Sequence, residues 1–285
     1  MSYTNDNALV DTAWVAAHLD DPKVRIVDAS WHLPPTGRNG HDEYREAHIP
    51  GAIYFDIDAI SDPDTTLPHM MPTAEAFSAA VGGLGIANNH RVIAYDSEGL
   101  FSAPRVWWML RAFGHDNVAV MTGGFRIWKS EGRPVSDEPP TPSATEFNAQ
   151  LNTDMVRSLA QMHANMDSGG ELVLDARAAN RFAGTEPEFR PGVRPGHIPG
   201  SGNLPYSEIV DAEAGAFVSS GDLRNAFDTH GATGTQPITT TCGSGLTACI
   251  LGLGLHLIGR DNWAVYDGSW TEWGGSEDTP IEAEG

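Results

Sequence analysis

An internal repeat constrains the fold of this 285-residue chain more than any other feature of its sequence. The segment Val24–Ala29 recurs in pattern as Glu171–Ala176, and a His-Ile-Pro-Gly turn that begins at His48 recurs at His197. The copies lie about 147 to 149 positions apart, which is much longer than the repeat of a solenoid. We therefore expect two copies of one whole domain.

Both halves alternate two patterns of apolar residues, one typical of buried strands and the other of helices. In the first half we expect strands at 24–29, 91–96 and 118–121 and helices at 9–19, 73–84 and 102–113. In the second half we expect strands at 172–176, 238–242 and 263–266 and helices at 154–166, 222–229 and 246–258. This alternation predicts an α/β fold in which each half is a mostly parallel sheet with helices on both faces.

Prolines gather between the two halves. The stretch Arg133–Ala144 holds four of them together with Ser, Asp and Glu, a composition that favours a semi-extended linker. We place the first domain at residues 1–138, the linker at 139–150 and the second domain at 151–285.

The composition excludes several classes of partner. The formal net charge of −21 opposes binding to nucleic acid or to an anionic membrane, because their phosphates would be repelled. No apolar run reaches the roughly 18 residues that a membrane helix needs, and the N-terminus lacks the basic and apolar regions of a signal peptide. The two cysteines, Cys242 and Cys249, have neither CxxC nor metal-site spacing. These features indicate a reduced, cytoplasmic protein without a metal site.

Cys242 follows the predicted strand at 238–242 and opens a glycine-bearing turn before the apolar helix. A side chain in this position lies beside free N–H groups and the positive end of the helix dipole, which favour an anion such as a thiolate. We therefore interpret Cys242 as a nucleophile rather than as a buried structural thiol, the role that we assign to Cys249. The repeat-equivalent residue in the first half is Asp96, whose carboxylate cannot perform the same chemistry. The first domain is thus predicted to be catalytically silent.

The charge of the Cys242 loop restricts its substrate. A cysteine phosphatase would carry the signature Cys-x5-Arg, but this chain has Ala248 at the arginine position. The loop offers backbone N–H groups and the hydroxyls of Ser244 and Thr247, which suit a neutral or weakly charged group. No phosphate-binding loop, dinucleotide fingerprint or HExxH zinc motif occurs in the sequence. We therefore expect neither a metal nor an organic cofactor.

Two arginines of the second half, Arg181 and Arg190, bracket a turn rich in Gly and Pro. A lone arginine in such a loop would be a solvated charge, whereas two of them around one turn are suited to a bidentate grip on a carboxylate. The neighbouring Arg177 and Arg194 are expected to be structural or to lie at the rim of the site.

The duplicated domain, the two His-Ile-Pro-Gly turns and the segment Cys242–Ala248 resemble the tandem rhodanese-domain sulfurtransferases. The Cys-Gly-Ser-Gly sequence is similar to that of their 3-mercaptopyruvate sulfurtransferase branch, because the thiosulfate branch places basic residues directly after its cysteine. The resemblance covers nearly the whole chain, and Leu246 stands where valine is usual. It implies two tandem rhodanese-like domains, of which the second is catalytic.

The same resemblance implies a set of site residues. Asp58 and His69 would by themselves be surface residues, but the family places an aspartate and a histidine at this spacing, facing the catalytic loop across the domain interface. The implied catalytic residues are Cys242, Ser244, Asp58 and His69, and the implied substrate-binding residues are Arg181, Arg190, Gly243, Gly245, Leu246 and Thr247.

The reaction that the resemblance implies moves sulfur from 3-mercaptopyruvate to the Cys242 thiolate, which releases pyruvate and leaves a persulfide on the enzyme. The persulfide then passes its outer sulfur to an acceptor such as a small thiol, thioredoxin or cyanide. Two alternatives stay open at this point. One is a thiosulfate:cyanide sulfurtransferase, and the other is a non-enzymatic persulfide carrier, which would have no need for Arg181 and Arg190.

Overall fold

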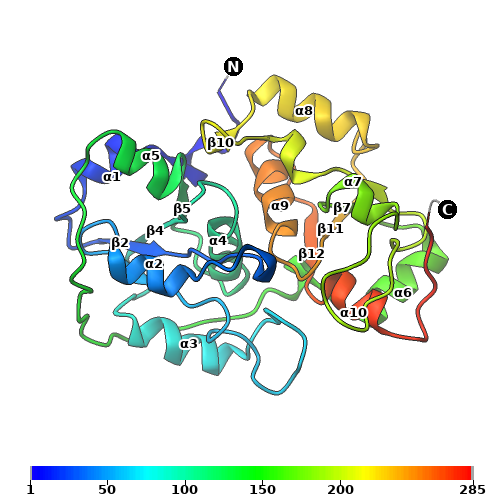
Figure 1. The fold of residues 1–285 in the computed structure, drawn as a ribbon, viewed down its shortest axis with the longest axis horizontal. Helices are drawn as coiled ribbons and strands as arrows, with labels where there is room; N and C mark the ends of the chain where they lie inside the picture. The colour runs from blue at the N-terminus through cyan, green and yellow to red at the C-terminus, as the bar shows by residue number, and fades with distance from the viewer. Residues whose placement is uncertain (1, 284–285) are drawn as a thin grey trace.

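Two sheets of the same design, one in each half of the chain, organise the molecule (Figure 1). The computed structural model describes residues 2–283. The first half contains β1 (Leu9–Val10), α1 (Thr12–Ala17), β2 (Val24–Asp28), α2 (Gly40–Glu46), β3 (Ile53–Tyr54), α3 (Ala74–Gly83), β4 (Arg91–Tyr95), α4 (Ala103–Ala112), β5 (Val118–Met121) and α5 (Gly124–Ser130).

The second half repeats this series and adds a short hairpin. It contains β6 (Val156–Arg157), α6 (Leu159–Ser168), β7 (Leu172–Asp175), α7 (Ala179–Phe182), β8 (Gly202–Asn203), β9 (Val210–Asp211), β10 (Ala216–Phe217), α8 (Ser220–Thr229), β11 (Ile238–Thr241), α9 (Ala248–Leu257), β12 (Trp263–Tyr266) and α10 (Ser269–Gly275). The hairpin is formed by β9 and β10, which pair antiparallel.

The strand order is the same in both sheets. It is β1-β5-β4-β2-β3 in the first half and β6-β12-β11-β7-β8 in the second. Every pair within these two five-stranded sheets is parallel. The predicted α/β class and the predicted duplication are therefore confirmed.

The expected helices at 9–19 and 154–166 are wrong at their N-terminal ends, where the chain forms the edge strands β1 and β6. Each helix begins only after a capping residue. Asp11 accepts a hydrogen bond from the Trp14 amide at 2.7 Å, and Ser158 forms a capping box with Gln161. Strands of two residues are too short to show an alternating pattern, which is why the sequence did not reveal them.

A single apolar core continues from one domain into the other. It joins α3 and α4 of the first domain to α8 and α9 of the second, while separate clusters cover the opposite faces of the sheets under α1 and α5 and under α6 and α10. Figure 1 shows α4 and α9 facing each other between the two sheets. Across this interface the ring of Trp107 stacks on Trp263 with centroids 6.0 Å apart. The two domains are thus packed as one unit.

A buried ion pair crosses the same interface. Arg105 of α4 is fully buried, and its Nη1 lies 2.7 Å from Oδ1 of Asp267, the buried residue after β12. The second oxygen of Asp267 accepts the Met71 amide at 2.7 Å, and the guanidinium lies 4.5 Å above the ring of Trp108. A charge that has lost its water requires such partners, so each of these two residues holds the other in place.

The two sheets differ in how they neutralise one buried carboxylate. Asp175, at the end of β7, is paired with Arg177 at 2.7 Å. The repeat-equivalent carboxylate is Asp28, at the end of β2, and the position of the arginine is taken by Ser30. Burial raises the pKa of Asp28 to about 6, because the charged form has no cation beside it.

We expect Arg105→Met to lower the free energy of unfolding by about 3–5 kcal/mol, because Asp267 is then a buried charge without a partner. The double variant Arg105→Met with Asp267→Asn removes both charges and is expected to recover a substantial part of this loss. Urea denaturation followed by circular dichroism measures both. An equal loss in the single and double variants would show that the ion pair does not set the stability of the interface.

Asp28→Asn should stabilise the fold at pH 8 by up to about 3 kcal/mol. The folded-state pKa of Asp28, about 6, lies above its ordinary 3.8. The folded state therefore binds the proton more tightly, and stability falls as the pH rises from about 4 through 6. The advantage of the variant should vanish at pH 4. Asp175→Asn is the matched control, and it should destabilise at both pH values because it breaks a formed ion pair.

Candidate active site at the domain interface

Cys242 lies directly beyond the carboxyl end of β11, and its side chain is buried. The start of α10 holds the backbone here. The Cys242 amide donates to Oγ of Ser269 at 3.2 Å, and the Cys242 carbonyl accepts from Trp270 at 2.9 Å. The Gly243 carbonyl accepts the Thr271 amide at 2.8 Å. A neighbouring helix terminus thus fixes the first two residues of the loop.

Gly245 has a positive φ of 75°, a conformation that side chains rarely adopt. A Cβ atom there would lie 2.7 Å from the Asp267 carbonyl and 2.9 Å from Nη1 of Arg105. The carbonyl of Gly245 accepts a hydrogen bond from Nη1 of Arg105 at 3.1 Å. Gly245 therefore fits the loop against the domain interface, and it does not line the cavity at Cys242.

The loop after β4 of the first domain is the repeat-equivalent of the Cys242 loop, and it surrounds a carboxylate. Asp96 occupies the position of Cys242, and its carboxylate accepts a set of backbone N–H groups at 2.5–3.0 Å. The donors are Glu98, Gly99, Phe101, Ser102 and Ala103. In the second domain no acceptor for the N–H groups of residues 244–247 lies in the described part of the chain. The turn of the first domain surrounds a carboxylate, and Cys242 occupies the position of that residue in the second domain.

The Cys242 side chain opens into a cavity of about 210 Å³ between the domains. Gly243, Leu246 and Thr247 line it from the loop, as the sequence predicts for residues that bind a substrate. Further walls are largely aromatic and come from both domains: Trp31, Phe101, Phe189 and Tyr206.

Arg181 and Arg190 converge on the same cavity. A Cβ atom on Gly243 would lie 3.3 Å from Nη2 of Arg181 and 3.5 Å from Nη1 of Arg190. Arg190 also donates from Nη2 to Oγ of Ser244 at 3.2 Å. The loop has no basic side chain of its own, but the fold brings two guanidinium groups to it.

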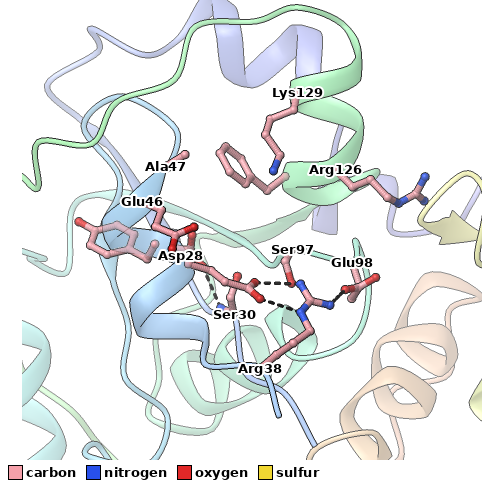
Figure 2. A pocket seen from close by; sticks show the side chains of 12 residues that line it. Asp28, Ser30, Arg38, Glu46, Ala47, Ser97, Glu98, Arg126 and Lys129 are labelled. Carbon is pink, nitrogen blue, oxygen red and sulfur yellow. Dashed lines mark hydrogen bonds and ion pairs between the residues drawn. The ribbon is translucent and has the colours of Figure 1, made fainter. Parts of the chain in front are cut away.

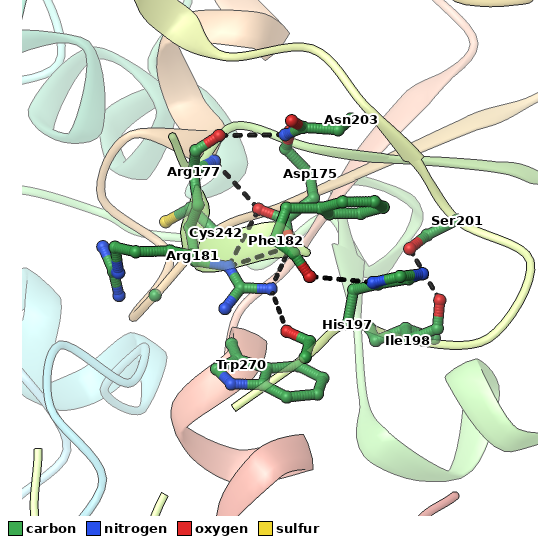
Figure 3. A network of polar contacts seen from close by, with 12 residues as sticks. Asp175, Arg177, Arg181, Phe182, His197, Ile198, Ser201, Asn203, Cys242 and Trp270 are labelled. Carbon is green, nitrogen blue, oxygen red and sulfur yellow. Dashed lines mark hydrogen bonds and ion pairs between the residues drawn. The ribbon is translucent and has the colours of Figure 1, made fainter. Parts of the chain in front are cut away.

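The two arginines differ in their other contacts. Arg181 forms an ion pair with the buried carboxylate of Glu188, which also binds Nη1 of Arg177 at 2.8 Å. Figure 3 shows Arg177 inside this network, with Arg181 and Cys242 beside it. Arg190 has no ion pair among the described residues, and burial lowers its pKa. Arg190 is thus the guanidinium that is most available to an anionic ligand.

The first domain contributes His69, which contacts the loop, and Asp58, which contacts His69. His69 is buried, with Nδ1 3.1 Å from the Ser244 carbonyl and Nε2 3.1 Å from Oδ1 of Asp58. The approach to Asp58 has the distance of an ion pair but lacks hydrogen-bond alignment. Trp31 donates to Asp58 at 2.9 Å, and the neighbouring His69 lowers the pKa of Asp58. Both ring nitrogens of His69 thus lie near oxygen atoms, one in the loop and one on Asp58.

Sequence reasoning missed three residues that build this site: Arg105, Ser269 and Glu188. Arg105 also donates to the carbonyl of His69, whose φ of 65° is unusual for a residue with a side chain. Its only signal in the sequence is an arginine placed directly before the apolar run Val106–Leu110 of the helix.

Cys249 is fully buried in α9, and its thiol donates to the Gly245 carbonyl at 3.2 Å. Burial raises its pKa well above the ordinary value for a thiol, which suits the packing role expected for it. Within residues 2–283 no cluster of three or more His, Cys, Asp or Glu side chains could hold a metal ion. In the same residues no helix is both long and apolar enough to cross a membrane.

The rhodanese-like domain model matches the chain twice, at residues 11–131 and 158–276. Together the two matches cover most of the chain, and each contains nearly all of one five-stranded sheet.

Individual proteins are also similar over nearly their whole length. The 3-mercaptopyruvate sulfurtransferase of Rattus norvegicus is 44% identical over 272 residues, covering 93% of this chain and 91% of that protein. The thiosulfate sulfurtransferase of the same species is 42% identical over 273 residues, with coverage of 93% and 91%. The crystal structure of SseA from Escherichia coli, described as a 3-mercaptopyruvate sulfotransferase, superposes with a TM-score of 0.84 at 37% identity and covers 92% of this chain and 98% of that one.

Proposed function

The chain belongs to the rhodanese family as a sulfurtransferase with two tandem domains, and from this premise we propose that it is a 3-mercaptopyruvate sulfurtransferase with Cys242 as nucleophile. The observation that carries the proposal is the convergence of Arg181 and Arg190 over Gly243, next to the Cys242 side chain. A keto acid presents its carboxylate and carbonyl on one side and its sulfur on the other. The cavity offers two guanidinium groups that can bind the carboxylate and carbonyl, and one thiol that can react with the sulfur.

Substrate binding falls to the two arginines. Arg190 is available for the carboxylate, since its one contact with the loop is the hydroxyl of Ser244. Arg181 is held in orientation by Glu188 and points a second guanidinium at the same space. Planar guanidinium groups match the geometry of a carboxylate and an adjacent carbonyl oxygen. Binding in this way orients the substrate sulfur toward Cys242 and stabilises the enolate that forms when the sulfur leaves.

Sulfur transfer then needs no outside oxidant. The Cys242 thiolate forms an S–S bond with the substrate sulfur while the C–S bond breaks, and the electron pair of that bond stays on carbon as the pyruvate enolate. The substrate sulfur keeps its proton as the outer S–H of the persulfide. One proton added to the enolate carbon gives pyruvate. The sulfur is oxidised and the carbon is reduced within the same step.

We assign the supply of that proton to His69, oriented by Asp58, with the Ser244 hydroxyl as the group between His69 and the cavity. The support is positional: His69 contacts the Ser244 carbonyl at 3.1 Å, and the Ser244 hydroxyl lies beside Arg190. A histidine side chain at the edge of the loop is a suitable group for such a proton transfer.

The second half-reaction returns the enzyme to its thiol form. A thiol acceptor attacks the outer sulfur, the S–S bond breaks, and the Cys242 thiolate leaves, stabilised by the free N–H groups of residues 244–247. We propose a small thiol, thioredoxin or cyanide as the acceptor, and no resident cofactor. A catalytic thiol that must stay reduced between turnovers fits the cytoplasm.

Thiosulfate is the rival donor. The similarity to the rat thiosulfate sulfurtransferase, 42%, is close to the 44% for the rat 3-mercaptopyruvate enzyme. Arg190, 3.2 Å from the Ser244 hydroxyl, also places a positive charge where a dianion could use it. The two donors differ in the group beyond the sulfur, which is a planar keto acid in one and a tetrahedral sulfonate in the other.

We expect kcat/KM with 3-mercaptopyruvate to exceed that with thiosulfate by about 10²-fold or more, because only the keto acid uses both arginines in a planar grip. Pyruvate release coupled to lactate dehydrogenase and thiocyanate formation measure the two reactions. Equal or reversed values would make the protein a thiosulfate sulfurtransferase.

The nucleophile is tested in the same assays. Cys242→Ser should abolish pyruvate release, since a hydroxyl does not form the persulfide, and Cys249→Ser should retain it. Persulfide detected by mass spectrometry on Cys242 without any pyruvate turnover would instead indicate a non-enzymatic carrier.

Arg190→Ala should raise KM for 3-mercaptopyruvate and lower kcat/KM by roughly 10²-fold, because it removes charge-assisted hydrogen bonds to the carboxylate. Arg45→Ala is the matched control, since Arg45 lies exposed on α2 and should leave both constants unchanged. A kcat/KM that is the same in the Arg190 variant and in the control would remove Arg190 from substrate binding.

A further inference from the structure

The guanidinium of Arg177 sits in a site that the second domain builds around it. Asp175 accepts from its Nε at 2.9 Å and from its Nη2 at 2.7 Å. The Gly196 carbonyl accepts from Nη2 at 2.8 Å, and the ring of Trp270 lies 4.6 Å from the guanidinium carbon. Glu188 completes the set at 2.8 Å from Nη1. Carboxylate, carbonyl and aromatic face together form a receptor for a guanidinium.

The first domain keeps the walls of this receptor and lacks the arginine. The repeat places Asp28 at the position of Asp175, Ala47 at that of Gly196, and Phe125 at that of Trp270. Ser30 stands where Arg177 would be. All four residues line one cavity of about 380 Å³ (Figure 2). Loss of the long side chain has therefore left a space with the surrounding groups still in place.

The cations around the cavity are engaged elsewhere. Arg38 binds Glu43 at 2.7 Å and also pairs with Glu98. Arg126 donates to the carbonyls of Ala212 and Glu213, at 2.8 Å each.

Lys129 lies with its Nζ 4.8 Å from the centre of the Phe125 ring. No ion pair among the described residues joins Lys129, or any other cation, to Asp28. Asp28 is 2% exposed, and it accepts hydrogen bonds from the Ser30 amide at 2.9 Å and from the side chains of Ser30 and Tyr95. Burial raises its pKa. The cavity thus contains a buried carboxylate that is hydrogen-bonded but has no cation beside it among the described residues.

We propose that this cavity of the first domain binds the guanidinium group of a small molecule of the size of free arginine. In this site Asp28 would bind the guanidinium as Asp175 binds that of Arg177. The Ala47 carbonyl corresponds to the Gly196 carbonyl, and the Phe125 ring corresponds to the ring of Trp270. Lys129 at the rim complements a carboxylate at the other end of the ligand. The site lies at the carboxyl ends of the strands of the first sheet, and its ligand is independent of the sulfur chemistry at Cys242.

Calorimetric titration of the full-length protein with L-arginine tests this site. We expect saturable binding of one equivalent, and binding at least tenfold weaker for L-citrulline, which has the same shape but a neutral urea group. Asp28→Asn should weaken L-arginine binding by about tenfold or more, because the charged partner is lost. Arg190→Ala should leave it unchanged, which separates this cavity from the cavity at Cys242.

Ser30→Arg supplies the missing side chain and should abolish binding by filling the cavity from within. Ser130→Arg adds the same charge at an exposed position of α5 and is the matched control. The proposal is overturned if L-arginine shows no saturable binding up to about 10 mM, if L-citrulline binds equally well, or if Asp28→Asn binds as the parent protein does. Should Ser30→Arg fail to fold, the comparison of Asp28→Asn with the parent still decides.

Discussion

The buried guanidinium of Arg105 is the group on which the active site depends. It belongs to the first domain, yet it holds Asp267 and the Gly245 carbonyl of the second domain, and the His69 carbonyl of its own. Its two Nη atoms donate to these three groups, while its Nε has no partner among the described residues. The positions of the three acceptors are thus fixed relative to one another. The catalytic loop and the proposed proton donor are therefore held by a single side chain, and neither domain alone contains a complete site.

Duplication also explains why the proposed mechanism uses the turn of the second domain and not that of the first. Both copies fold the turn after their central strand so that N–H groups point inward, a geometry that selects an anion of any kind. In the first domain the carboxylate of Asp96 accepts these N–H groups and closes the turn. In the second domain Cys242 supplies a sulfur that can change its chemical state. In the proposed mechanism the two turns share one backbone design and differ in one side chain, which is Asp96 in the first domain and Cys242 in the second.

The sequence revealed the parts of the fold that have a long local pattern. Buried strands such as Val118–Met121 and capped helices such as α3 appeared where expected, because periodicity and caps are local properties. Two-residue edge strands have no period and were missed. In the site, Cys242 was identified from its position before a helix, whereas His69 and Asp58 were implied only by the family resemblance. Arg105 could not be found, because its partners lie in another domain and its burial is a property of the packing.

The distribution of charge shows at what range an anionic substrate can be recognised. The chain has 17 basic residues against 38 acidic ones, and Arg105, Arg177, Arg181 and Arg190 all lie at the Cys242 loop or one contact away from it. At long range the acidic surface repels an anionic substrate, but that repulsion is screened within about 8 Å at physiological salt. Inside the cavity the arginines act with little water around them, where each interaction is stronger. Recognition of an anionic donor is therefore a short-range event, which places selectivity in the geometry of the guanidinium groups and not in the field of the whole protein.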